Sequence, residues 1–185
     1  MIIALLRSVY YNLHMEVFIV FREMRRFKQQ LSSDECIAIL NKETAGVLAL
    51  HGDDDYPYAV PLSYVYADNK LYFHGAKTGH KIDAISRNPK ASFCVVSEDN
   101  VVPEKYTTYF RSAIAFGKMR IITDEAEKRE AIEMLAKKYF PEDSADHRNK
   151  AIESEYRPLC MFVLEIEHMT GKEAIELTRA KRGQA

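Results

Sequence analysis

Basic and imidazole side chains gather after one short apolar run, in the segment LYFHGAKTGHK at residues 71–81. His74 ends the run, and Lys77, His80 and Lys81 come within the next seven residues. Ammonium and imidazole groups at one loop suit an anionic ligand, above all a phosphate group. The competing interpretation is that both lysines are solvated surface side chains, as most lysines are.

The residues after this loop favour a helix. Thr78 is expected to cap a helix that runs from about Gly79 to Arg87, with Ile82 and Ile85 facing inward. A helix N-terminus offers unpaired backbone N–H groups and a partial positive charge. Gly79 would let a ligand approach the backbone closely. The segment therefore predicts a phosphate site at the start of this helix.

The segment YAVPLSYVYA at residues 58–67 carries a second signal. One face of this predicted strand carries Tyr58, Val60, Leu62, Tyr64 and Tyr66, and the other carries Ala59, Pro61, Ser63, Val65 and Ala67. The second face is shallow enough for a flat aromatic ring, and Pro61 favours a break in regular strand pairing. Packing against a core would produce the same alternation. Beside a phosphate site, however, a shallow strand indicates a flat cofactor with a phosphorylated tail, and FMN has that shape.

The remaining elements must position these two segments. Apolar runs bounded by turn residues predict strands at 45–52, 58–67, 71–76, 91–98, 111–123 and 160–171, the first three as an antiparallel meander. Helical patterns predict helices at 33–42 after a capping box, at 79–87, at 124–140 and at 172–179. Gly117 is expected to form a bulge or bend in its strand. We therefore expect a mainly β fold, a six-stranded antiparallel barrel with inserted helices.

Composition bounds the function classes. The 185 residues are 47% hydrophobic and 29% charged, which suits one globular domain, and the net charge of −1 gives no whole-protein reason to bind nucleic acid or an anionic membrane. Three cysteines lie far apart without zinc-site spacing, so they indicate buried thiols in a reducing cytoplasm. The acidic run Asp53–Asp55 after His51 indicates a turn, and no metal site is expected. Dinucleotide, P-loop and serine-hydrolase motifs are absent from the sequence.

The first 23 residues need separate treatment. They are strongly apolar, but Arg7, Asn12, His14 and Glu16 interrupt them, so neither a spanning helix nor a signal peptide is expected. We divide the chain into an extension at 1–23, which an upstream start codon would explain, and a single domain at 24–185. If the extension is made, its apolar residues are expected to pack on the body of the protein or on a partner chain.

Several of these segments together resemble a known family. They are PYAVPLSY at 57–64, LYFHGA at 71–76, GHK at 79–81, NP at 88–89, FGK at 116–118 and TGK at 170–172. In this order and spacing they resemble the pyridoxamine 5'-phosphate oxidase-like flavin-binding split barrels, and within them the nitroimidazole-resistance proteins. The resemblance covers roughly residues 24–175, and the extension falls outside it.

This resemblance implies an FMN-binding homodimer with two active sites at the subunit interface. It implies that Val60, Pro61, Leu62, Ser63 and Tyr64 line the isoalloxazine, that His74 and Gly75 lie beside the ring and ribityl chain, and that Thr78, His80 and Lys81 reach the phosphate. Residues of the 106–112 stretch would approach from the second subunit. His74 occupies the place that this group associates with activity, so it is the expected catalytic residue. Its alternative role is only to hydrogen-bond the cofactor or the backbone.

The function implied is an FMN-dependent oxidoreductase. It would take electrons from NADH or NADPH and reduce a small, electron-poor acceptor such as a nitroaromatic. Related split barrels leave other roles open, namely pyridoxamine phosphate oxidation, a deazaflavin, or haem held by His74 or His168. A flavin-binding module without turnover is a further alternative, since fold alone does not decide chemistry.

Overall fold

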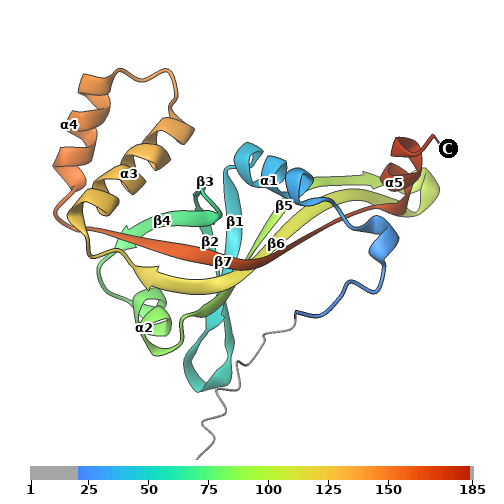
Figure 1. Ribbon diagram of the computed structural model, residues 1–185, viewed down its shortest axis with the longest axis horizontal. Coiled ribbons are helices and arrows are strands. Elements are labelled where there is room, and N and C mark those ends of the chain that lie inside the picture. The colour runs from blue at the N-terminus through green and yellow to red at the C-terminus, as the bar shows by residue number, and fades with distance from the viewer. Residues whose placement is uncertain (1–20, 184–185) are drawn as a thin grey trace, which may run out of the picture.

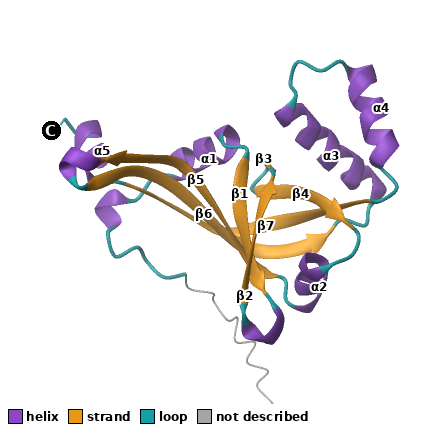
Figure 2. Cartoon of the chain, turned by 180° about the vertical axis from the view of Figure 1, so that it is seen from behind, coloured by secondary structure: helices purple, strands orange, loops and turns teal. Residues whose placement is uncertain are grey.

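A computed structural model describes residues 21–183, and the predicted extension therefore lies outside the described residues except for positions 21–23. Seven strands form one antiparallel sheet (Figures 1 and 2). The strands are β1 Ala45–His51, β2 Pro57–Ser63, β3 Val65–Ala67, β4 Lys70–Ala76, β5 Lys90–Val102, β6 Thr107–Ile121 and β7 Leu159–Glu173. The helices are α1 Ser33–Lys42, α2 His80–Arg87, α3 Glu125–Tyr139, α4 Ala145–Glu155 and α5 Ile175–Lys181. Short 3-10 turns lie at Phe27–Gln29, Asp53–Asp55 and Pro103–Lys105.

The strand order is β2-β1-β5-β6-β7-β4-β3. The antiparallel pairing was predicted, and β1–β2 and β3–β4 pair as the expected meander requires. The number of strands was wrong, because the sheet has seven and not six. The expected strand at 58–67 breaks at Tyr64, so β2 and β3 lie at opposite ends of the sheet. The break follows from burial, because the Tyr64 ring enters the core and its N–H donates to Tyr139 Oη at 3.0 Å instead of to a neighbouring strand. β2 also contacts β4, which curls the sheet towards a barrel.

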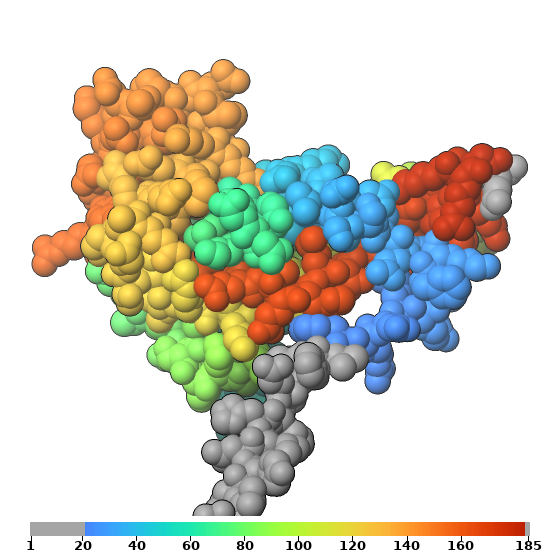
Figure 3. Space-filling model, viewed as in Figure 1, coloured from blue at the N-terminus to red at the C-terminus, as the bar shows by residue number. Residues whose placement is uncertain are grey.

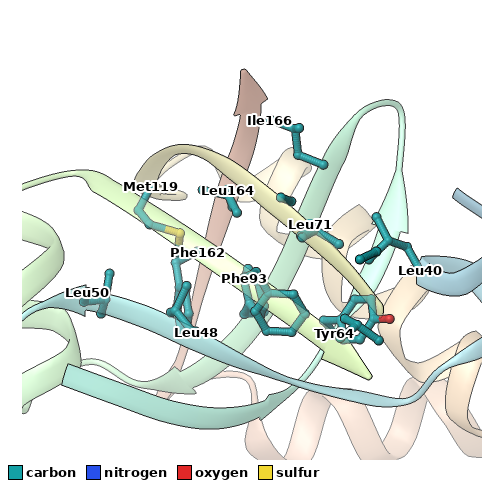
Figure 4. Packing of buried hydrophobic residues seen from close by; sticks show 14 of the residues in the cluster. Leu40, Leu48, Leu50, Tyr64, Leu71, Phe93, Met119, Phe162, Leu164 and Ile166 are labelled. Atoms are coloured by element: carbon teal, nitrogen blue, oxygen red, sulfur yellow. The ribbon is translucent and has the colours of Figure 1, made fainter. Parts of the chain in front are cut away.

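The main core lies inside this curled sheet (Figure 4). The aromatic rings of Tyr64, Phe73, Phe93 and Phe162 are fully buried there and pack at centroid distances of 4.9–5.5 Å. Alternate residues of β1 and β5 supply aliphatic side chains to the same core, as the sequence pattern predicts. The bulge at Gly117 is confirmed, since the β6–β7 register shifts between Phe116 and Gly117.

The helix boundaries were mostly predicted, with two exceptions. The capping box of α1 is present, with Ser32 and Glu35 bonding reciprocally. The cap of α2 is Gly79 and not Thr78, and no side chain caps this helix. The sequence pattern also missed α4. Ile152 is the only residue of this helix that is buried, so no apolar stripe marks the helix in the sequence. With α3 and α4 together above one end of the sheet, the fold is mixed α/β and not mainly β (Figure 1).

The C-terminal end of α3 fastens α1 to the sheet. The Lys138 ammonium donates to the carbonyl oxygens of Leu40 at 3.1 Å and Glu43 at 2.7 Å, at the end of α1, and lies 4.0 Å from the centre of the Tyr64 ring. Cations favour helix C-termini because carbonyl groups there lack partners. Desolvation nevertheless lowers the pKa of Lys138 to about 8.

This lowered pKa predicts a pH dependence of stability. Between about pH 8 and 10.5 the unfolded chain binds a proton at Lys138 that the folded chain has lost, so stability should rise with pH in this window. The Cys36 thiol, whose pKa burial raises to about 11, acts in the opposite direction above pH 9. Urea unfolding of the natural protein and of Lys138→Met separates the two, because only the variant should lack the rising contribution. Identical pH profiles would contradict the assignment.

No helix within residues 21–183 is long and apolar enough to cross a membrane.

Candidate functional site

The first turn of α2 lies between β2 and β4, the two strands that meet across the open side of the sheet. On the β2 side, the His80 ring stacks on Tyr58 with centroids 4.1 Å apart. On the β4 side, the Lys81 ammonium lies 3.2 Å from the position that a Cβ of Gly75 would occupy, and 5.0 Å from the centre of the Phe162 ring. The fold therefore brings His80, Lys81 and Gly75, which the sequence predicted together, to one place.

Lys81 is a cation without an anion. Among residues 21–183 it forms no ion pair within 4 Å, whereas the half-buried Arg111, Arg120 and Arg129 each do. Desolvation lowers the pKa of its ammonium. A partly buried, unpaired charge is costly, and an anionic ligand would offset that cost. The end of the Lys81 side chain lies directly over Gly75, 3.2 Å from where a Cβ of that residue would be, so the ammonium is held against the backbone of β4.

The backbone before α2 suits the same ligand. Gly79 adopts a φ of 118°, which is strained for other residues, and no atom lies within 4 Å of a Cβ built on it. The first N–H groups of a helix have no partner within the helix. Thr78 is exposed beside this turn, with its side chain available to a ligand rather than used as a cap. These features fit the phosphate of a cofactor such as FMN.

His74 is adjacent to Gly75 on β4 and points to the exposed side of the strand. Its side chain reaches solvent, but packing around the ring lowers the pKa of the imidazole, and the nearby Lys81 charge lowers it further. His74 is therefore neutral near pH 7 and has one ring N–H to donate and one ring nitrogen to accept.

This coupling gives a testable pKa. Titration of the histidine ring protons by NMR should place the pKa of His74 below 6.5. In Lys81→Met that pKa should rise, because the charge that opposes protonation is removed while the burial stays. An unchanged His74 pKa would show that the two groups are not electrostatically coupled.

β2 presents the predicted flavin-lining residues on two sides. Ala59, Pro61 and Ser63 are exposed, whereas Val60 and Leu62 are half-buried against the core. One edge of β2 has no neighbouring strand in the sheet, so backbone groups along that edge are open to a ligand. Tyr64 differs from its predicted role, because its ring is fully buried and its hydroxyl has no partner among the described residues. Only its backbone lies at the end of the predicted site.

Asp53 and Arg87 join the site although sequence reasoning did not assign them to it. Arg87 donates to Asp53 Oδ1 at 2.7 Å, and His80 Nε2 lies 3.6 Å from Asp53 Oδ2. The Arg87 guanidinium holds the pKa of Asp53 below its usual range. The acidic run Asp53–Asp55 forms the predicted turn. Asp53 also links that turn to α2 through its contacts with Arg87 and His80. The described residues contain no group of three or more candidate metal ligands.

Solved structures of similar fold include several flavin-related proteins. A candidate 5-nitroimidazole antibiotic resistance protein from Bacteroides thetaiotaomicron VPI-5482 aligns with a TM-score of 0.65 and 22% identity, over 78% of this chain and 86% of that one. An FAD-binding protein from Mesorhizobium loti aligns with a TM-score of 0.58 and 26% identity, over 79% and 97%. An FAD- and haem-binding protein from Mycobacterium smegmatis aligns with a TM-score of 0.66 and 22% identity, over 80% and 73%.

Sequence comparisons agree with this fold. An uncharacterised protein of Rhizobium meliloti (strain 1021) is 36% identical over 66 residues, which span 36% of this chain and 42% of that protein. The family model described as pyridoxamine 5'-phosphate oxidase matches residues 32–173, from the cap of α1 to the end of β7. That match takes in most of the chain and every strand of the sheet, so the protein belongs to the pyridoxamine 5'-phosphate oxidase-like split-barrel family.

Proposed function

We propose that this protein is an FMN-dependent oxidoreductase that passes electrons from NADH or NADPH to a small, electron-poor acceptor, a nitroaromatic such as a 5-nitroimidazole being the candidate. The observation that carries the proposal is the half-buried Lys81 ammonium, which has no ion-pair partner among residues 21–183 and lies against Gly75 at the first turn of α2. A phosphate group bound there would place the rest of a flavin along β2 and β4, the strands that flank the first turn of α2.

Each part of the site has a role in this proposal. Lys81 and the first turn of α2 bind the phosphate, while Pro61 and Ser63 offer a shallow surface for the ring. FMN supplies the hydride and electron transfer when it is bound. His74 is mainly neutral near pH 7, so its ring N–H can orient an acceptor oxygen by a hydrogen bond, and the minor protonated form of the ring can give a proton to that oxygen and take up another from solvent.

The comparisons support a flavin without choosing its form. One structure of similar fold is described as binding FAD and another as binding FAD and haem. FMN and FAD both carry a phosphate on the ribityl chain, so the Lys81 site accepts either. We favour FMN because the segments at 57–64 and 71–81 resemble those of the FMN-binding split barrels.

Optical spectroscopy of the freshly purified protein is the first test. Flavin absorption bands, followed by release of about one FMN per chain, are the expected result. A Soret band would replace this proposal with haem binding. A colourless protein that takes up neither FMN nor FAD would overturn it.

The catalytic role of His74 is tested by turnover. In His74→Ala, NADPH oxidation with a nitroaromatic acceptor should fall by about 10²-fold or more while FMN stays bound, because the proton donor is lost. His147→Ala is the control, since His147 is exposed on α4 and should leave turnover unchanged. Loss of FMN together with activity would instead assign His74 a binding role. Unchanged turnover would remove His74 from the catalytic machinery.

We also propose that the protein acts as a homodimer in the cytoplasm. The site around His74 and Lys81 is open on one side, and the β2 edge beside it has no strand neighbour. A second subunit would cover both and exclude water from the flavin. Sedimentation equilibrium should give twice the mass of 21.3 kDa. A monomer that still holds FMN and turns over would contradict the shared site.

A further inference from the structure

The end of β2 lies beside the surface that the proposed flavin ring would use. Pro61 and Ser63 belong to that surface, and Ser63 is the last residue of the strand. On one side β2 pairs with β1, and the last pair of this ladder joins Ala45 to Ser63. On the other side β2 has no neighbouring strand in the sheet. The end of an edge strand tends to fray, so a flavin surface at this place needs a further support.

One hydroxyl group joins β1 and β2 just beyond the last pair of their ladder. The next residues in this register are Thr44 and Tyr64. Tyr139 Oη accepts a hydrogen bond from the Tyr64 N–H at 3.0 Å and donates to the Thr44 carbonyl oxygen. The Tyr64 carbonyl oxygen, at 3.3 Å, is a second acceptor for the same hydroxyl. The hydroxyl therefore bridges the two strands at the step where their direct pairing stops.

Helix α3 brings this hydroxyl from another part of the chain, since Tyr139 is its last residue. α3 packs against β3 and β4, and α1 also contacts β3 (Figure 3, gold α3 beside green β3 and β4). The neighbouring Lys138 ammonium bonds the carbonyl oxygens of Leu40 and Glu43. Two adjacent side chains of α3 therefore hold different elements. Lys138 holds the end of α1, and Tyr139 holds the end of β2.

Burial makes the contact at Tyr64 hard to replace. The Tyr64 ring is fully buried, so the residue cannot turn its N–H to water without drawing the ring out of the core. Without the Tyr139 hydroxyl, the Tyr64 N–H and the Thr44 carbonyl lose this partner, and unmade backbone hydrogen bonds are costly away from water. The end of β2 would then be tied less firmly, and Ser63, one residue earlier, would share that freedom.

We infer that Tyr139 is a positioning residue for the flavin ring. It acts through the backbone, because its hydroxyl fixes the end of β2 and β2 presents Pro61 and Ser63 to the ring. A surface that is ordered before the ligand arrives binds more tightly than one that must be ordered on binding. The inference rests on the proposed function, which places the flavin ring on β2. Lys81, in contrast, bears on the phosphate.

Tyr139→Phe tests the inference, since it removes the hydroxyl and keeps the ring. In titrations of the flavin-free protein, the affinities for FMN and for riboflavin should both fall by about tenfold, because the two ligands carry the same ring. Loss of a phosphate contact would weaken FMN alone. Lys138→Met is the matched control, because it loosens α1 from the neighbouring position of α3 and should change either affinity by less than about twofold.

Hydrogen exchange separates positioning from general support of the fold. Coupling between two sites is reciprocal, so saturation with riboflavin should slow exchange of the Tyr64 amide, which donates to Tyr139, by about tenfold in the natural protein. The Lys150 amide on α4 is the control and should exchange equally with and without riboflavin. This measurement needs no variant, so it tests the inference even if Tyr139→Phe does not fold.

The outcomes distinguish this inference from the proposed function. If the natural protein binds both flavins and Tyr139→Phe binds them with unchanged affinity, the inference is overturned and the proposed function stands. Equal losses in Tyr139→Phe and Lys138→Met, or unchanged exchange of the Tyr64 amide, would also overturn it, since they would show a role in stability alone. A natural protein that takes up neither flavin would overturn the proposed function and the inference together.

Discussion

Replacing Lys81 with methionine should lower the affinity for FMN by about 10²-fold. The half-buried ammonium has no ion-pair partner among the described residues, and a charge-assisted contact to phosphate is worth about 2–3 kcal/mol. Methionine keeps the length of the side chain and its packing over Phe162. Fluorescence titration of the flavin-free protein with FMN measures the change.

Two comparisons make this result specific. Riboflavin lacks the phosphate, so its affinity should change much less than that of FMN in Lys81→Met. Lys150→Met removes the same charge from exposed helix α4 and should leave FMN affinity unchanged. If both flavins weaken equally, Lys81 supports the ring or the fold and not the phosphate. If the affinity for neither flavin falls, the phosphate site lies elsewhere, and the unpaired Lys81 ammonium no longer supports the proposed function.

Gly117→Ala should destabilise the protein by about 3 kcal/mol or more. A Cβ on Gly117 would lie 1.9 Å from the carbonyl oxygen of Glu165, which belongs to the backbone of β7 and cannot rotate away. Relief would require β6 and β7 to separate at the bulge between Phe116 and Gly117. Overpacking against a backbone atom at a register shift disturbs the pairing of β6 with β7, the two longest strands of the sheet.

Gly75→Ala is the matched control for this prediction. Its Cβ would meet the Lys81 ammonium at 3.2 Å, which is the flexible end of a side chain and can move. Urea unfolding of both variants without flavin should therefore show a large loss for Gly117→Ala and a loss below about 1 kcal/mol for Gly75→Ala. Similar losses would mean that the β6–β7 pair adapts to the extra methyl group and that the bulge is not sterically required.

Local signals located most elements along the chain. The capping box at Ser32, the stop of α2 near Asn88 and the alternation in β1 and β5 are properties of neighbouring residues, so the sequence was sufficient for them. α4 was missed because its helical register is polar, and a polar helix differs little from a polar loop in pattern. The strand at 58–67 was drawn too long because its alternation continues through Tyr64, while the break depends on Tyr139, 75 residues away.

Part of the candidate site was also predictable, because its residues are close together in the sequence. His74, Gly75, His80 and Lys81 lie within eight positions of each other, and a strand–loop–helix order alone brings them near one another. Asp53 and Arg87 were not assigned to the site, since their pairing joins segments 34 residues apart. The burial of Tyr64 could not be predicted either, because a tyrosine in an alternating strand suits a buried core position and a flavin-contacting surface equally well.

The sequence by itself determined the strand-and-helix order, the basic loop before α2 and the likeness to a flavin-binding family, because these depend on residues close together in the chain. Only the tertiary structure decided that β2 and β3 separate to opposite ends of the sheet, that Lys81 has no ion-pair partner among residues 21–183, and that Asp53 pairs with Arg87 beside His80. These depend on which distant segments pack together, and burial energy summed over the whole chain sets that choice.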